Sequence, residues 1–132
     1  MSSWTAIVTC LALVLYLVHA IRVTLARGRY SIMAPATTGH PTFERLLRIQ
    51  ANTGEQMILF LPSLWLFSLY LSALWASVLG LVWILARAAY AIVYEANPDK
   101  RAIPFALAFA ATVILLAGGL VGSLLSLLHG AG

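Results

Sequence analysis

Long apolar runs fill most of this 132-residue chain, and they limit its folding more than any other feature. Hydrophobic residues make up 62% of the sequence and charged residues 9%, whereas about 25% of a soluble domain is charged. A soluble bundle of this size could not bury so much apolar surface, but a bilayer needs only ~20 apolar residues per crossing helix. We therefore predict an all-α integral membrane protein with a single domain over residues 1–132. Its four transmembrane helices are expected at about 4–25, 43–72, 73–94 and 102–128.

The basic residues predict how such a bundle lies in the membrane. They gather around the loops after the first and third helices, whereas the turn at residues 71–74 carries no charge. With four crossings these two loops share one side, which the positive-inside rule makes cytoplasmic, and both termini lie opposite. The net charge of +4 does not predict nucleic-acid binding, because no basic strip lies on a soluble element. The three histidines lack metal-ligand spacing, so no metal is expected.

Polar residues interrupt the second apolar segment at helical spacing. Arg48, Asn52 and Glu55 stand at i, i+4 and i+7, which places them on one face of a helix, with Arg45 a turn earlier. Glu55 follows Phe43 by roughly 18 Å of helix rise, so we expect it below the lipid headgroups. Ionisable groups at such a depth normally face the protein interior or a water-filled cavity.

The third helix carries a second polar face near its end. Arg87, Tyr90 and Tyr94 stand at i, i+3 and i+7, and Arg101 follows across the next turn. Because both polar faces lie at the cytoplasmic end of the bundle, we expect them to meet at a common site.

Two interpretations of these faces stay open on the residues alone. In the first, Glu55 pairs with Arg48, Arg87 or Arg101 in a buried network that fixes helix register. In the second, the surplus of cations binds a ligand with two carboxylates and one ammonium, a pattern that glutathione has. Arg87 is equally consistent with a structural contact and with a ligand contact.

The stretch FERLLRIQANTGE, followed by ILARAAYAIVY and then Arg101, resembles the MAPEG family, membrane-associated proteins in eicosanoid and glutathione metabolism. The closest pattern is that of leukotriene C synthases and microsomal glutathione transferases, whose FER..R.Q.N..E and A-R-x-x-Y-x-x-x-Y stretches are matched at identical spacing. The stretch PATTGHPTFER is also similar to the family's first loop. The resemblance covers roughly residues 27–104.

This resemblance implies a homotrimer in which glutathione lies between neighbouring subunits, near the cytosolic end. The implied glutathione-binding residues are Arg48, Asn52, Glu55, Tyr90, Tyr94 and Arg101 of one subunit, with Arg27 and Gln50 of its neighbour. The candidate catalytic residues, which would stabilise the thiolate, are Arg27, Arg29 and Arg101. The implied activity is that of a membrane-bound glutathione transferase, a detoxification enzyme that joins the thiolate to a lipophilic electrophile or lipid. A glutathione peroxidase reaction would use the same thiolate.

Three departures from the family pattern limit what the resemblance implies. Gly28 stands where the synthases have the second arginine of a pair, Gln56 where they have a tyrosine, and Val113 near a tryptophan of their last helix. The identity of the thiol-activating arginine and of the lipid substrate is therefore open, and Arg29 is a candidate to replace the missing arginine. The alternative function is that of a non-enzymatic lipid-binding accessory protein of the same fold, although the family's accessory protein lacks the arginine that corresponds to Arg48.

Overall fold

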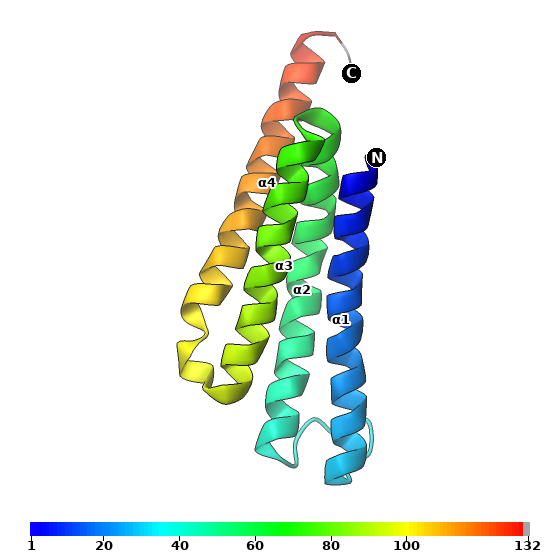
Figure 1. Cartoon of the computed structure of the whole chain (residues 1–132), viewed down its shortest axis with the longest axis vertical. Helices are drawn as coiled ribbons and strands as arrows, with labels where there is room; N and C mark the ends of the chain where they lie inside the picture. Colours follow the sequence, from blue (N-terminus) through cyan, green and yellow to red (C-terminus); the bar gives the residue numbers. More distant parts are fainter. Residues whose placement is uncertain (131–132) are drawn as a thin grey trace.

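The computed structural model of the chain describes residues 1–130, and within them the regular elements are all helical. Four long helices follow one another: α1 (Ser3–Tyr30), α2 (Pro41–Tyr70), α3 (Ala73–Ala96) and α4 (Ala102–Leu128), with a short 3-10 turn, η1 (Pro98–Lys100), before α4. Figure 1 shows the helices running side by side, with the start of α1 and the end of α4 at the same end of the bundle. The predicted four-helix, all-α fold is confirmed.

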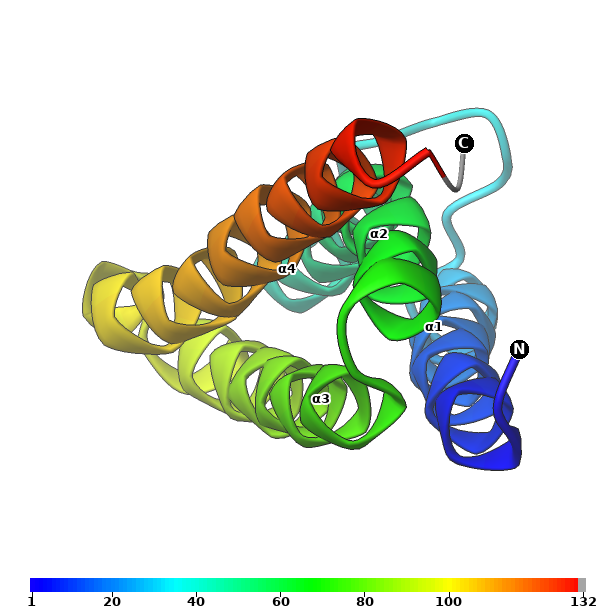
Figure 2. The same ribbon diagram turned by 90° about the horizontal axis from the view of Figure 1, so that it is seen from above.

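Three of these helices, α1, α3 and α4, are long and apolar enough to cross a membrane within the described residues. The exception is α2, because polar residues occupy its first half. It contacts α1, α3 and α4, and Figure 2 shows it between α1 and α4 when the bundle is seen from above. The polar half of α2 is therefore flanked by other helices along the bundle.

The end of α1 differs from the prediction. The helix continues past residue 25 to Tyr30, so the first part of the expected loop is helical. It ends where Ser31 adopts a left-handed conformation, with φ at 56°, and its N–H bonds to the Arg27 carbonyl. Cations in a last helical turn interact favourably with the helix dipole, and Arg27 and Arg29 lie there. Gly28 weakens this turn by about 1 kcal/mol relative to alanine but does not end the helix.

The loop between α1 and α2 is tied to both helices. The Nη1 atom of Arg27 donates a hydrogen bond to the Ala36 carbonyl over 2.8 Å. His40 caps α2, because its Nδ1 atom accepts a hydrogen bond from the Thr42 N–H over 3.1 Å, and its ring stacks on Tyr30 with the ring centroids 3.7 Å apart. These contacts fix the loop beside the polar half of α2.

A polar clamp at Glu95 joins the first three helices at the same end. Arg22 on α1 donates from Nη2 to both carboxylate oxygens of Glu95 on α3, over 2.8 and 2.7 Å. Arg45 on α2 donates to the Glu95 backbone carbonyl over 2.8 Å. Arg45, which the sequence placed with Arg48, is therefore engaged by α3, and the clamp holds the helix ends that carry the predicted site.

Candidate functional site

Side chains from α2, α3 and the start of α4 line a hollow of about 520 Å³ at the loop end of the bundle. Its lining residues are Arg48, Asn52, Tyr90, Tyr94, Asp99, Arg101, Ala102 and Phe105. This arginine hollow contains most of the residues that the polar faces of the sequence singled out. The two polar faces come together at these residues.

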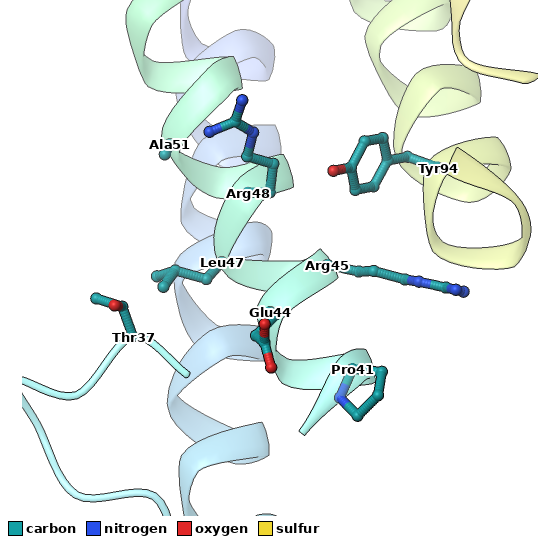
Figure 3. A pocket seen from close by; sticks show the side chains of 8 residues that line it. All are labelled: Thr37, Pro41, Glu44, Arg45, Leu47, Arg48, Ala51 and Tyr94. Carbon is teal, nitrogen blue, oxygen red and sulfur yellow. The ribbon is translucent and has the colours of Figure 1, made fainter. Parts of the chain in front are cut away.

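A second hollow of about 590 Å³ opens beside the first and shares Arg48 and Tyr94 with it. Its lining residues are Thr37, Pro41, Glu44, Arg45, Leu47, Arg48, Ala51 and Tyr94, shown in Figure 3. The figure shows the Tyr94 hydroxyl directed toward α2 and Thr37 entering from the loop. Arg48 thus stands between two adjoining spaces, one against α4 and one beneath the loop.

Regular helix geometry explains how the arginine hollow forms. Arg48 and Asn52 lie one turn apart on α2, and Tyr90 and Tyr94 lie one turn apart on α3, with their ring centroids 5.6 Å apart. Arg101 stands at the start of α4, where its Nη1 atom donates to the Pro98 carbonyl over 2.8 Å. Its guanidinium carbon lies 6.0 Å from the centroid of the Tyr94 ring.

The hollow combines two cations with neutral hydrogen-bonding groups and one carboxylate. Arg48 and Arg101 are both exposed, and the one salt bridge among residues 1–130 is formed elsewhere, by Arg22 and Glu95. The Oδ1 atom of Asn52 is buried and has no hydrogen-bond partner within the described chain. The site therefore offers positive charge for anionic groups and an unused acceptor for an N–H donor.

The interpretation in which Glu55 pairs with an arginine has no counterpart within one chain, because no salt bridge to Glu55 is found among the described residues. Glu55 is exposed and lines a separate hollow of about 430 Å³ between α1 and α2, together with Tyr16 and Gly54. Arg48 and Glu55 share a side of α2, but two turns, or about 10 Å of helix rise, separate them. Helical spacing correctly predicted that Arg48 and Glu55 point to the same side of α2. Their separation along the helix axis, however, prevents a contact between them.

The structure places three more predicted residues outside the arginine hollow of their own chain. The guanidinium carbon of Arg27 lies 4.9 Å from the centroid of the Phe43 ring, and Arg27 borders a hollow beside the loop. Arg29 lies over Tyr30, at 5.6 Å from the ring centroid, and borders a small hollow at the Glu95 clamp. Gln50 is partly buried and stands two residues from Arg48, which places it on the other side of α2.

Arg87 is also absent from the lining of the hollow. It is fully buried, and its Nη2 atom donates to Thr53 Oγ1 over 2.7 Å. The structural alternative for Arg87 is therefore the one that the geometry supports, although its partner is a hydroxyl rather than a carboxylate.

Three lining residues were not predicted from the sequence: Ala102, which directly follows the predicted Arg101, and Asp99 and Phe105. Asp99 lies in the turn immediately before Arg101, and Phe105 stands one helical turn after Arg101. Asp99 and Phe105 stand at i−2 and i+4 from the predicted Arg101, and this spacing is the signal in the sequence that points to them. Within residues 1–130, no group of three His, Cys, Asp or Glu side chains is placed to hold a metal ion.

Comparison with known proteins identifies the family of this chain. The model of the MAPEG family matches residues 5–121. An uncharacterised protein of Synechocystis is 49% identical over 125 residues, covering 95% of this chain and 88% of the relative. The human microsomal glutathione S-transferase 2 is 36% identical over 103 residues, covering 78% of this chain and 70% of the relative. The leukotriene C4 synthase of Cavia porcellus is 34% identical over 119 residues, covering 90% of this chain and 79% of the relative.

These matches extend across the polar faces on α2 and α3 and the start of α4 that line the arginine hollow. They confirm the resemblance predicted from the sequence. The chain belongs to the MAPEG family of membrane proteins.

Proposed function

We propose that this MAPEG protein is a glutathione transferase that binds glutathione in the arginine hollow and joins its thiolate to a lipophilic electrophile at the membrane. The observation that carries the proposal is the meeting of five predicted residues in one hollow. They are Arg48, Asn52, Tyr90, Tyr94 and Arg101. The names of the relatives, microsomal glutathione S-transferase 2 and leukotriene C4 synthase, support the same reaction class.

The chemistry of the hollow fits the groups of glutathione. Arg48 and Arg101 provide charge-assisted hydrogen bonds for its two carboxylates. The unpartnered Oδ1 of Asn52 accepts an N–H of the peptide. The ammonium group needs a carboxylate, for which we propose Glu55, as the family resemblance implies, although Asp99 is the acid that lines the hollow of the same chain.

We further propose that the protein is a homotrimer whose sites are completed by neighbouring chains. Arg27 and Gln50 lie outside the arginine hollow of their own chain, which a site shared between subunits would explain. Native mass spectrometry in detergent is expected to give three times the 14.3 kDa of one chain. Most of the basic residues lie at the end of the bundle that carries the site and its loops, so we propose that this end faces the cytoplasm, with both termini opposite.

Glutathione binding is tested by thermal stability, because a ligand that binds only the folded state raises the melting temperature. We expect a saturable rise for the wild-type protein and a rise near zero for Arg48→Ala. Glu55→Gln and Asp99→Asn identify the ammonium partner, since removal of the true partner weakens the rise more. Lys100→Ala is the matched control, because it removes an exposed positive charge beside Arg101 without touching the lining. A folded wild-type protein without any rise would favour the lipid-binding accessory function instead.

The thiol is activated by a nearby cation. A cysteine-type thiol has a reference pKa of about 8.5, and an adjacent guanidinium lowers the pKa and holds the thiolate. Of the candidates Arg27, Arg29 and Arg101, we propose Arg101 for this role, because it is the one that lines the arginine hollow. The same thiolate would support a peroxidase reaction.

Arg101→Ala is therefore expected to lower turnover on the order of 100-fold. Because Arg101 is also proposed to hold a carboxylate of glutathione, the variant should bind glutathione more weakly as well. Steady-state kinetics with a lipophilic electrophile and a direct binding measurement separate the two effects. Arg29→Ala serves as the comparison, because Arg29 borders the Glu95 clamp. If Arg29→Ala instead gave the larger loss of turnover, the thiolate would be held by an arginine from a neighbouring chain.

A further inference from the structure

Arg87 is the most unusual side chain in the interior of the bundle. It is 0% exposed, and no carboxylate among residues 1–130 pairs with it. Of its five N–H donors, one reaches Thr53 Oγ1, whereas Nε and Nη1 find no hydrogen-bond partner in the described part of the chain. Burying a charge without a counter-ion is unfavourable, so Arg87 costs stability where it stands.

The Arg87 guanidinium makes its other main contact with an aromatic ring. Its Cζ atom lies 4.1 Å from the centroid of the Tyr90 ring, which follows three residues later on the same side of α3. Cation–π attraction is strongest where both groups are removed from water, and Tyr90 is only 3% exposed. Tyr90 lines the arginine hollow, so Arg87 packs against one wall of the hollow without entering it.

The hydrogen bond to Thr53 extends this support to α2. Thr53 is fully buried and directly follows Asn52, whose side chain lines the hollow from the α2 side. The Nη2 to Oγ1 distance of 2.7 Å is short and joins α3 to α2 at that level. Arg87 therefore contacts groups behind two facing walls of the hollow, one through a ring face and one through a hydrogen bond.

We propose that Arg87 is a positioning residue, which holds Tyr90 and Asn52 in the relative position that the glutathione site needs. This role rests on the proposed function. A neutral side chain of similar length would fill the same space without burying a charge. What the guanidinium adds is a fixed distance between α2 and α3, and a displacement of about 1 Å in a binding group can cost on the order of 100-fold in rate.

The first test separates positioning from stability. Arg87→Met is expected to melt at or above the wild-type temperature, because it removes an unpaired buried charge, while the glutathione Kd rises and kcat/KM falls roughly 10- to 100-fold. Thr53→Val removes the hydrogen-bond acceptor but keeps the shape, and it should weaken glutathione binding in the same direction. Trp83→Phe is the control, because Trp83 is buried one turn earlier on α3, stacks on Phe60 and lines none of the hollows around the site. An Arg87→Met protein with wild-type Kd and kcat/KM would overturn the proposal.

A second test needs no glutathione and distinguishes this proposal from the proposed function. Fluorotyrosine is incorporated into the protein, and the ¹⁹F resonance of Tyr90 is assigned with Tyr90→Phe. We expect Arg87→Met to shift and broaden that resonance, and Trp83→Phe to leave it in place. If the wild-type protein binds no glutathione, the proposed function fails while this measurement still decides whether Arg87 holds Tyr90. An unchanged Tyr90 resonance in Arg87→Met would refute the positioning role.

Discussion

If the protein is the proposed homotrimeric transferase, trimers that contain both Arg27→Ala and Arg48→Ala chains are expected to regain about one third of the wild-type conjugation activity, although each variant alone is inactive. Arg48 lines the arginine hollow, whereas Arg27 lies elsewhere on the same chain. If each site takes Arg48 from one subunit and Arg27 from the next, a mixed ring of three chains has one junction at which both arginines are present. The ring has one intact junction whether it contains two Arg27→Ala chains or two Arg48→Ala chains.

The experiment uses co-expression of two differently tagged variants and purification through both tags in succession. The matched control pairs Arg48→Ala with Asn52→Ala, because both residues line the same hollow of one chain and no junction can then be intact. Absence of recovery in the first pair would mean that each chain completes its own site. Recovery of about one half instead would indicate a dimeric ring.

Gly122→Ala is expected to lower the free energy of unfolding by about 1–3 kcal/mol, despite the better helix propensity of alanine. A Cβ atom at this position would lie 2.8 Å from the Tyr70 carbonyl oxygen and 3.0 Å from its carbon. These are backbone atoms at the end of α2, which cannot rotate aside as a flexible side chain can. The close approach of α4 to α2 therefore depends on the missing side chain of Gly122.

Thermal unfolding in detergent measures this effect, with Gly28→Ala as the control. Gly28 also lies in a helix, but an added Cβ there meets nothing within 4 Å. Gly28→Ala should therefore stabilise the protein by up to about 1 kcal/mol, through helix propensity alone. A loss of stability for Gly28→Ala, or none for Gly122→Ala, would contradict the account of α4 packing.

Helical spacing was sufficient to predict much of the site. Arg48 with Asn52, and Tyr90 with Tyr94, meet in the hollow because residues four apart share a helix face and the two helices run side by side. The four helices follow from the apolar runs, since runs of this length suit helices that cross the bilayer and satisfy their own backbone hydrogen bonds in lipid. Because only a short turn separates the end of α3 from the start of α4, Arg101 lies at the same end of the bundle as Tyr94.

The remaining features depend on distances that a periodic pattern does not contain. Glu55 shares a direction with Arg48 but lies in another hollow, because the pattern gives no axial distance. Arg87 shares a face with Tyr90 and Tyr94, yet it is buried behind them, since the depth of a side chain depends on the neighbouring helix. Arg45 donates a hydrogen bond to the backbone carbonyl of Glu95, and a pattern of side chains in the sequence does not reveal a backbone partner.

The polar first half of α2 has a consequence for how the protein is made. Each arginine or aspartate at the centre of an isolated helix disfavours its insertion by about 2.5–3.5 kcal/mol, and α2 is the helix that does not qualify to cross a membrane by itself. It contacts α1, α3 and α4, so we expect its insertion into the bilayer to depend on these neighbouring helices. We therefore expect Arg48 to reach its final depth only together with the helices that pack around it.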